Sequence, residues 1–365
     1  MKIAFLQPNL KAGGGNRSQI VLANGLMERG HDVSIIVPKG LVSKTPLQIK
    51  ARIEEVGFPI SNLYLSALVN YPLIGFSLRK YDAVVVTFSI IVCFTFLFTW
   101  LFGTKFFYFA RSYDPLILDQ TKIGSRCLLW LYRFMARLSY EIPLKLIVNS
   151  KWTGQMIAKN TFRKATYQVV SNGVDLSVFN CSQQFEGDSE KECKQILVLG
   201  KIQEYKGLGD LYAALEILIR KQSNFELVIM TPDEIQVRDS LLYKATIVRP
   251  TNDQEIAMAY KNADVFVSSS WYEGFCLPPL EAMACGTPVA LTDSGGVREY
   301  ATHEYNCLMS PAREPEKLAK NIEVLLTDNV LASRLVQNGL NTAQKFTWEK
   351  SVNKIETILI QKEEK

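Results

Sequence analysis

The chain has 365 residues, of which 48% are hydrophobic and 21% are charged. This composition excludes a disordered tail, a collagen-like rod and a disulfide-stabilised miniprotein, and the length suits two domains. The net charge of +5 conceals an asymmetry. Residues 1–180 contain 21 Lys and Arg against 9 Asp and Glu, whereas residues 181–365 contain 20 against 27. A half with charge +12 is thus followed by a half with charge −7.

Short runs of β-branched and aromatic residues alternate with longer amphipathic segments. The runs occupy residues 3–6, 33–37, 83–86, 106–109, 146–148 and 168–170 in the first half, and 196–199, 227–230, 246–248, 265–267 and 288–291 in the second. Nearly continuous apolar strands separated by helices are typical of parallel sheets covered on both faces. Two such sets predict an α/β protein with two doubly wound, Rossmann-like domains.

A polar and charged run at residues 180–194 separates the two sets and suits an exposed linker. We therefore expect one domain at residues 1–180 and a second at residues 181–346. Near the end, residues 348–360 carry apolar side chains at helical spacing. The final segment, residues 347–365, is expected to form a helix that packs back on the first domain.

The most apolar stretch, SIIVCFTFLFTWLF at residues 89–102, is 14 residues long. It falls short of the ~20 residues that span a bilayer as a helix. A buried core helix and a partly exposed helix that touches a membrane both remain open. The seven cysteines form no C-x-x-C pair, and no signal peptide precedes the first strand, so we expect a reduced, cytoplasmic chain.

Two loops with glycines follow expected strands, where ligands bind in open α/β sheets. Gly13, Gly14 and Gly15 follow the first strand and could offer free N–H groups to an anion, although a flexible turn has the same sequence. Lys201 and Lys206 lie in a glycine-bounded loop after another strand. Together they could bind one diphosphate, or they could be solvated surface lysines.

The most informative region begins after the strand at residues 265–267. Glu273 lies in a loop, and Pro278 and Pro279 suit the first turn of a helix that carries Glu281. Carboxylates accept hydrogen bonds from hydroxyl groups, so the two glutamates suit a sugar and a ribose. The helix N-terminus between them favours a phosphate.

These residues resemble the E-x7-E signature of retaining glycosyltransferase family 4, which has the GT-B fold. The resemblance extends over nearly the whole chain. Further matching segments are the glycines at 13–15, RGHDV at 29–33, SNGVD with Phe179 at 171–179, GKIQEYKG at 200–207, ACGTPV at 284–289 and SGGVRE at 294–299. The resemblance implies two Rossmann-like domains that face a central cleft.

The resemblance also implies roles for individual residues. Glu273 and Lys206 would be catalytic, with Glu273 at the transferred sugar and Lys206 and Lys201 on the donor diphosphate. Glu281 would bind the ribose. The remaining donor contacts would come from Gly14, Gly15, the chain near Arg249, which would meet the base, and the backbone of Gly274, Phe275, Cys276 and Leu277.

The sequence departs from the family pattern at several positions. Lys201 stands where the family usually has Arg, so a bidentate phosphate contact becomes a point charge. Cys276 and Cys307 each replace a usual glycine, and Cys276 would narrow the sugar pocket.

The family often places a histidine after the fourth strand of its first domain, where this chain offers Tyr113 and Asp114. We expect these two residues to contact the acceptor. The only histidines, His31 and His303, are interpreted as a packing residue and a loop residue. No histidine base can therefore be assigned.

The expected activity is transfer of a hexose from a UDP- or GDP-sugar, with retention, to a glycan or lipid-linked acceptor in cell-surface polysaccharide or glycoconjugate biosynthesis. No metal-binding motif is visible, so we expect a metal-independent reaction without a cofactor. A non-catalytic GT-B accessory subunit of a partner glycosyltransferase is the main alternative. A GT-B epimerase or phosphorylase would need histidine or cofactor chemistry that the sequence lacks.

The basic half has no nucleic-acid-binding signature. It contains the apolar stretch at 89–102 and the basic residues Lys122, Arg126, Arg133 and Arg137. We therefore expect this half to bind an anionic membrane surface, which would make the protein peripheral on the inner face of a membrane.

Overall fold

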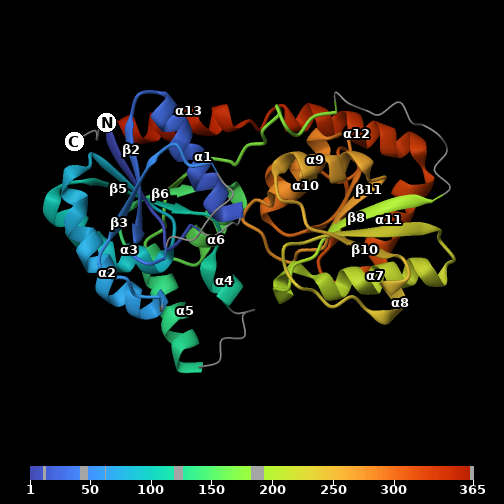
Figure 1. Cartoon of the computed structure of the whole chain (residues 1–365), viewed down its shortest axis with the longest axis horizontal. Coiled ribbons are helices and arrows are strands. Elements are labelled where there is room, and N and C mark those ends of the chain that lie inside the picture. The colour runs from blue at the N-terminus through green and yellow to red at the C-terminus, as the bar shows by residue number, and fades with distance from the viewer. Residues whose placement is uncertain (11–13, 42–47, 62, 119–125, 182–192, 362–365) are drawn as a thin grey trace. The chain divides into compact units, whose positions relative to one another are not determined.

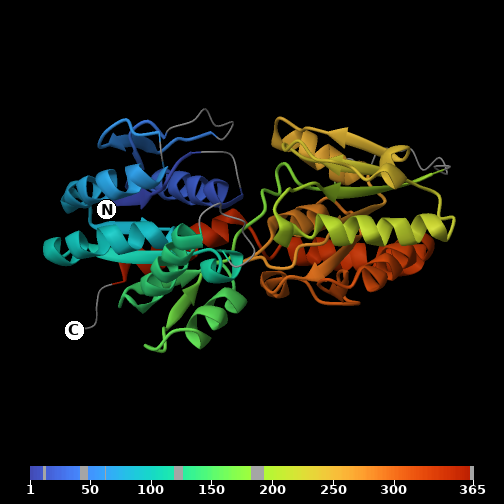
Figure 2. The same cartoon turned by 90° about the horizontal axis from the view of Figure 1, so that it is seen from below.

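The computed structural model describes residues 1–10, 14–41, 48–61, 63–118, 126–181 and 193–361. The chain divides into two compact units. The first contains Met1–Asn172 and Trp348–Lys365, and the second contains Gly173–Thr347. Each unit is an α/β domain built on a parallel sheet between layers of helices (Figure 1, Figure 2). The predicted fold class is therefore confirmed for both domains.

The first unit has a seven-stranded sheet of order β3-β2-β1-β4-β5-β6-β7. Its order reverses beside β1, which is where doubly wound sheets bind ligands. The strands are β1 (Lys2–Leu6), β2 (Asp32–Pro38), β3 (Arg52–Val56), β4 (Ala83–Val86), β5 (Lys105–Ala110), β6 (Lys145–Val148) and β7 (Tyr167–Val169). The helices are α1 (Gly14–Glu28), α2 (Leu63–Ser77), α3 (Ser89–Phe102), α4 (Asp114–Leu118), α5 (Arg126–Glu141), α6 (Lys151–Lys159) and α13 (Trp348–Ile360), with a 3-10 turn at Leu78–Lys80.

Alternating side chains divide the first unit into two cores, one on each face of the sheet. Ile3 and Phe5 of β1 point toward α1 and α13, whereas Ala4 and Leu6 point toward α2, α3 and α5. Helix α13 is fixed to the start of β2 by Glu356, which pairs with His31 at 2.8 Å and with Arg29 at 2.6 Å. The terminal helix is thus part of the first unit's core.

The second unit has a six-stranded sheet of order β10-β9-β8-β11-β12-β13. The strands are β8 (Lys194–Leu199), β9 (Phe225–Met230), β10 (Ala245–Val248), β11 (Val265–Ser268), β12 (Val289–Asp293) and β13 (Leu308–Pro311). The helices are α7 (Leu208–Arg220), α8 (Asp239–Leu242), α9 (Asp253–Asn262), α10 (Leu277–Ala284), α11 (Pro315–Thr327) and α12 (Asn329–Ala343), with 3-10 turns η2 (Glu204–Lys206) and η3 (Gly296–Glu299). Helices α7 and α11 cover one face, where their side chains and those of the strands form a hydrophobic core.

Two strands, β3 and β13, were not expected from the sequence. Both are edge strands. Strand β3 reads RIEEV and is mostly exposed, so it lacks the apolar run that marks a central strand. Strand β13 is only four residues long.

The domain boundary differs from the predicted position after residue 180. Residues 173–180 belong to the second unit. Val174 donates its N–H to the carbonyl of Phe346, and the fully buried Phe179 packs against Tyr260. The boundary therefore lies after Asn172, ahead of the polar run that suggested it.

The apolar stretch at residues 89–102 forms helix α3. Ile91, Val92 and Thr95 are buried, whereas Leu97 and Leu101 are exposed. The structure thus favours the partly exposed helix over the fully buried one. Among the residues described, no helix has both the length and the apolar character needed to cross a membrane.

Candidate functional site

The expected lysine loop lies after β8, in the second unit. Lys206 is the last residue of η2, and the following residue, Gly207, has a left-handed backbone with φ of 68°. A Cβ atom at Gly207 would lie 2.0 Å from the carbonyl oxygen of Ser269, so only glycine fits there. This contact joins the loop after β8 to the loop after β11.

Two hydrogen bonds strengthen the junction between these loops. Ser269 Oγ donates to the carbonyl of Lys206 at 3.1 Å, and the Trp271 N–H donates to the carbonyl of Tyr205 at 2.7 Å. The backbone of Lys206 is therefore held by the strand that leads to Glu273.

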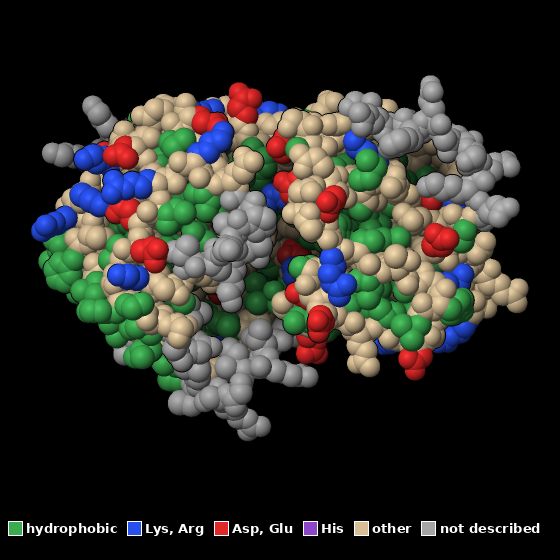
Figure 3. Space-filling model, viewed as in Figure 1, with side chains coloured by type: hydrophobic (Ala, Val, Ile, Leu, Met, Phe, Trp, Pro, Cys, Tyr) green, Lys and Arg blue, Asp and Glu red, His purple; other side chains and the backbone are tan. Residues whose placement is uncertain are grey.

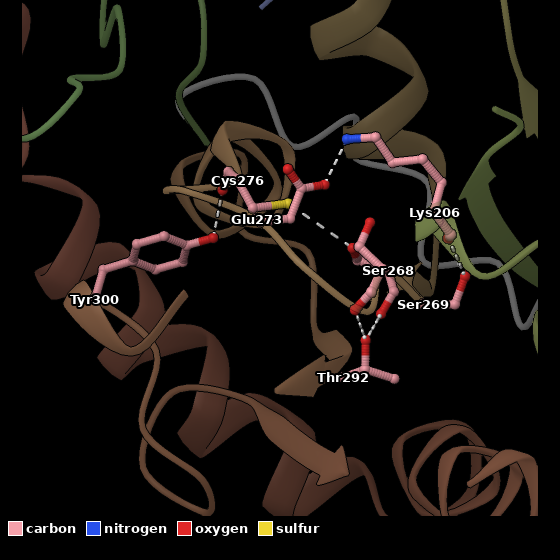
Figure 4. Close-up of polar contacts among 8 residues, drawn as sticks. Lys206, Ser268, Ser269, Glu273, Cys276, Thr292 and Tyr300 are labelled. Atoms are coloured by element: carbon pink, nitrogen blue, oxygen red, sulfur yellow. Dashed lines mark hydrogen bonds and ion pairs between the residues drawn. The ribbon is translucent and has the colours of Figure 1, made fainter. Parts of the chain in front are cut away.

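Lys206 and Glu273 form an ion pair of 2.6 Å between Nζ and Oε1 (Figure 4). Their side chains are only 26% and 16% exposed. Burial lowers the pKa of Lys206, but the Glu273 carboxylate outweighs this effect, and the pKa ends above its usual value. Lys206 thus remains a cation at neutral pH, beside a carboxylate that can turn toward a hydroxyl group.

Helix α10 begins directly after this pair, with Cys276 at its N-cap. Cys276 has φ of 64°, the left-handed region that favours glycine, which explains why the family usually has glycine here. Tyr300 fixes this turn by donating its hydroxyl to the carbonyl of Cys276. Burial raises the pKa of the Cys276 thiol well above its usual value, so it is a poor nucleophile.

The start of α10 presents unused hydrogen-bond donors. Pro278 and Pro279 have no N–H group. The N–H groups of Phe275, Cys276 and Leu277 have no partner among the described residues. Donors toward a ligand therefore come from this short segment, beside Lys206 and Glu273. The Phe275 side chain itself is buried against Tyr300, so only its backbone is available.

Lys201 lies at the end of β8, with its Nζ 3.8 Å from Asp233 Oδ2. Burial lowers the pKa of Lys201, and nearby Lys206 contributes in the same direction. The two lysines are therefore close enough for their charges to interact, and their binding of one diphosphate stays a prediction.

Glu281 and Arg249 lie in different surroundings from the lysine pair. Glu281, in the second turn of α10, is 7% exposed, and its Oε2 accepts a hydrogen bond from Tyr260 at 3.4 Å. Arg249 follows β10, is exposed, and lines a groove of about 420 Å³ along β9 and β10. Their expected contacts with ribose and base stay predictions.

The expected residues of the first unit lie at the carboxyl ends of its strands. Gly14 and Gly15 begin α1, whereas Gly13 lies outside the described residues. Tyr113 is 8% exposed and stacks on Tyr140, so its side chain is engaged in packing. Asp114 accepts a hydrogen bond from Ser112 at 2.8 Å, and burial raises its pKa.

Both histidines have structural partners. His31 pairs with Glu356, and His303 Nδ1 accepts a hydrogen bond from the N–H of Met309 at 3.0 Å. In the part of the chain that the structure describes, no three His, Cys, Asp or Glu side chains are grouped to hold a metal ion.

Several residues that support the site were not expected from the sequence. Trp271 donates its Nε1–H to Asp210 at 2.6 Å, and the Arg313 guanidinium lies 4.1 Å from the centre of its ring. Thr292 donates to the carbonyl of Ser270 at 2.6 Å, which holds the end of β11 against β12. The run of three serines after β11 was the only sequence signal for this network.

The two halves of the chain match different protein families. Residues 12–178 match the family described as "Glycosyltransferase Family 4", and residues 182–342 match "Glycosyl transferases group 1". An uncharacterized glycosyltransferase of Methanocaldococcus jannaschii is 27% identical over 198 residues, half of each chain. A D-inositol 3-phosphate glycosyltransferase of Jonesia denitrificans is 29% identical over 203 residues, 50% of this chain and 48% of the relative. The matches thus span about half the length of these curated relatives.

Solved structures share the fold over the whole chain. Sucrose-phosphate synthase from Thermosynechococcus elongatus has a TM-score of 0.82 at 19% identity and covers 98% of both chains. Anabaena HepE, solved in complex with UDP and glucose, has a TM-score of 0.75 at 17% identity and covers 98% of this chain and 99% of its own. WaaG, a glycosyltransferase involved in lipopolysaccharide biosynthesis, has a TM-score of 0.76 at 18% identity and covers 99% and 100%.

Proposed function

The chain belongs to glycosyltransferase family 4, since its two domains match two glycosyltransferase families over most of its length, and we propose that it transfers a sugar from a nucleoside diphosphate sugar to an acceptor hydroxyl with retention of configuration. The donor is a UDP- or GDP-hexose. The acceptor is a glycan or a lipid-linked sugar in cell-surface polysaccharide or glycoconjugate biosynthesis. No metal ion and no cofactor take part.

The observation that carries this proposal is the Lys206–Glu273 pair beside the N–H groups of residues 275–277, which have no partner in the part of the chain that the structure describes. When the sugar–phosphate bond breaks, negative charge grows on the departing diphosphate. Lys206, Lys201 and these N–H groups stabilise that charge because they are in place before the reaction. Glu273 accepts hydrogen bonds from the hydroxyl groups of the sugar.

The reaction needs no separate base. The bond between the anomeric carbon and the β-phosphate oxygen breaks, and the acceptor oxygen bonds to the same face of that carbon. The acceptor's hydroxyl proton passes to the departing phosphate oxygen. This route is compatible with two histidines that are both engaged elsewhere, His31 with Glu356 and His303 with Met309.

Solved proteins of the same fold support this donor class. HepE was solved in complex with UDP and with UDP-glucose. The lysine loop suits the diphosphate, which UDP and GDP share. The base, in which they differ, would lie near exposed Arg249. Choosing between UDP and GDP therefore requires binding measurements.

The donor is tested by calorimetry with UDP, GDP and a panel of their sugars, followed by hydrolysis assays. We expect binding of one nucleotide, slow hydrolysis of its sugar, and full activity after exhaustive EDTA treatment. The anomeric configuration of the product is read by NMR. Strict metal dependence or an inverted product would contradict the proposed mechanism.

A Glu281→Ala variant tests the ribose contact separately. We expect weaker nucleotide binding, because a carboxylate that accepts two ribose hydroxyls is lost. Glu316→Ala, at an exposed glutamate in the first turn of α11 in the same unit, is the matched control. Unaltered binding by Glu281→Ala would remove the ribose role.

The alternative function is a non-catalytic GT-B subunit that binds a partner glycosyltransferase. It would not need Lys206 and Glu273 in a preformed pair. Donor hydrolysis by the purified chain, lost in Lys206→Ala, would exclude this alternative, and inactivity toward every donor would favour it.

We also propose that the first unit binds a membrane surface, as a peripheral protein on the cytoplasmic side. Figure 3 shows hydrophobic side chains gathered over α2 and α5. Helix α3 packs between these two helices. The exposed apolar residues are Leu65, Leu73 and Phe76 of α2, Leu97, Leu101 and Phe102 of α3, and Trp130, Leu131, Phe134 and Leu138 of α5.

Helix α5 adds positive charge to this apolar surface. Trp130 and Phe134 stack at 5.8 Å, and exposed Arg137 lies one turn further along the helix. Apolar side chains with basic neighbours suit an anionic lipid surface. Of the other expected basic residues, Lys122 and the side chain of Arg126 lie outside the described parts.

Sedimentation with vesicles of phosphatidylglycerol and phosphatidylcholine at low salt tests this surface. We expect the Trp130→Ser/Phe134→Ser variant to lose binding, because it removes the stacked pair that would enter the interface. Phe162→Ser, at a phenylalanine that is 98% exposed in the same unit, is the control. Absence of binding by the unaltered chain would contradict a membrane role.

A further inference from the structure

Three polar side chains at the carboxyl ends of the first unit's strands, and a fourth in α1, have no function assigned so far. Gln7 follows β1, Thr87 follows β4, Arg111 follows β5, and Gln19 lies in α1. We call these four residues the Arg111 cluster. Strands β1, β4 and β5 are adjacent in the sheet, so the cluster lies at the edge where doubly wound sheets bind ligands.

Strand register places the three strand-end residues on one face of the sheet. Leu6 pairs with Val86, and Val86 pairs with Tyr108. Phe5, Val85 and Phe109 all point into the core beneath α1. Because side chains alternate along a strand, Gln7, Thr87 and Arg111 continue that same face.

Helix α1 closes over this face. A Cβ atom at Gly15 would lie 2.0 Å from Arg111 Nη1, so the guanidinium lies directly against the first turn of α1. Gln19 is one helical turn beyond Gly15 and faces the same core. The ring of Phe88, 5.1 Å from the guanidinium carbon, supports Arg111 on another side.

The polar atoms of the Arg111 cluster are buried without hydrogen-bond partners in the described structure. Both amide atoms of Gln7 and of Gln19, Thr87 Oγ1, and Arg111 Nε and Nη1 are in this state. Gln7, Gln19 and Thr87 are 1%, 0% and 5% exposed. Buried polar groups are nearly always paired, so four together point to a missing ligand.

Arg111 also lacks a counterion among the described residues. Asp114 is the carboxylate whose charge acts on it, but that side chain accepts its hydrogen bond from Ser112 instead. Burial lowers the pKa of Arg111 to about 10, which still leaves it charged at neutral pH. Asn149 holds its backbone by donating to the Arg111 carbonyl at 2.7 Å.

The chemistry of these groups selects an oxyanion. Arg111 offers the N–H groups of Nε and Nη1, which have no partner among the described residues. The glutamine amides and the threonine hydroxyl can each donate, and the first turn of α1 carries partial positive charge. We infer that the Arg111 cluster binds a phosphate or carboxylate group of the acceptor. The acceptor role rests on the proposed function, whereas the anion site itself does not.

The test measures anion binding on the full chain in a Lys206→Ala background, which removes the competing diphosphate site. Inorganic phosphate, acetate and chloride are titrated by calorimetry and by thermal shift. We expect saturable binding of phosphate or acetate, and the tighter of the two identifies the acceptor's group. Binding of neither would overturn the inference.

Two variants in that background separate binding from folding. Arg111→Met should weaken anion binding at least tenfold, the loss expected for a charge-assisted hydrogen bond. Gln19→Leu should weaken it by a smaller factor and yet raise the melting temperature without ligand, because it removes an unpaired buried amide. Lower stability with unchanged anion binding in Gln19→Leu would show a purely structural role and overturn the site.

The test of the anion site and the test of the proposed function can give different results. If the chain hydrolyses no nucleotide sugar but binds phosphate through Arg111, the proposed function fails and the anion site stands. If the chain hydrolyses a donor but Arg111→Met binds phosphate as before, the anion site fails and the proposed function stands.

Discussion

In the second unit each lysine of the site forms an ion pair with a carboxylate, whereas Arg111 in the first unit feels the charge of Asp114 but forms no ion pair within the described residues. Lys206 is 2.6 Å from Glu273, and Lys201 is 3.8 Å from Asp233. The first arrangement is stable without ligand, because each charge is compensated within the protein. The second is complete only when an anion enters. Both groups of residues lie near the carboxyl ends of strands in a parallel sheet. In the second unit the charges are paired, whereas in the first unit buried polar atoms have no partner among the residues described.

Removing Lys206 should have the largest effect on activity. It leaves Glu273 without its cation and removes a charge that would stabilise the departing diphosphate. We expect Lys206→Ala to lower turnover about 10²–10³-fold, the loss typical of a group that stabilises transition-state charge. Since its pKa is raised, Lys206 is charged at every pH below about 10.5, so the loss should be equal at pH 6 and pH 9. Steady-state rates at the two pH values measure this.

Lys221→Ala is the control for that loss. Lys221 forms an ion pair of the same length, 2.6 Å, with Glu323 on the surface of the same unit. Exposed pairs contribute little, so activity should not change. A rate for Lys206→Ala within twofold of the unaltered chain would contradict the role of the pair.

Gly207→Ala separates the two loops that hold the pair. An L-residue costs about 1–2 kcal/mol in this backbone region, and the new Cβ would press on the Ser269 carbonyl, for another 1–3 kcal/mol or so. We expect a loss of about 2–5 kcal/mol in the free energy of unfolding, measured with urea.

Gly209→Ala is the matched substitution two residues away. Nothing lies within 4 Å of the position that its new Cβ would take, in the first turn of α7. The substitution should be neutral or stabilising by up to about 1 kcal/mol. Equal stability of the two variants would contradict the tight junction.

Thr87→Val tests the Arg111 cluster of the first unit through its effect on stability. The hydroxyl of Thr87 is buried without a partner in the described residues, so its removal should stabilise the ligand-free chain by about 1 kcal/mol. In Thr153, also buried in the first unit, Oγ1 donates to Asn149 at 3.2 Å. Thr153→Val should therefore destabilise by about 1 kcal/mol. Urea unfolding of both variants gives the sign, and a destabilised Thr87→Val would contradict the interpretation of Thr87.

Cys276→Gly should have the smallest effect. Glycine relieves the left-handed backbone but loses the packing of the thiol, so we expect a change below about 1 kcal/mol. Cys276→Val should cost at least about 2 kcal/mol, because a β-branched residue is strongly disfavoured at positive φ. Thermal unfolding compares the two, and a stable Cys276→Val would show that the turn can relax.

Much of the local structure around the proposed donor site could be predicted from the sequence because its residues carry strong signals, although Lys206 and Glu273 are 67 positions apart. Gly207, Glu273 and the paired prolines are each marked by residue type and by position after a strand. The Arg111 cluster could not be predicted in this way. Glutamine and threonine at strand ends have no distinctive pattern, and their convergence depends on register across β1, β4 and β5.

The predictions missed the edge strands β3 and β13 and misplaced the domain boundary for related reasons. Strand β3 has no apolar run, and its place follows only from pairing with β2. The sequence predicts residues 173–180 in the first domain because the polar run begins only at residue 180, but the burial of Phe179 against Tyr260 places them in the second unit.

The position of α13 has a consequence for synthesis of the chain. Val352, Ile355, Ile358 and Leu359 complete the core on the α1 face of the first unit, although they are translated after the entire second unit. Until they emerge from the ribosome, that face of the sheet exposes apolar surface. The second unit, whose residues are contiguous, can fold first. The domain that begins the chain is therefore the last to be finished.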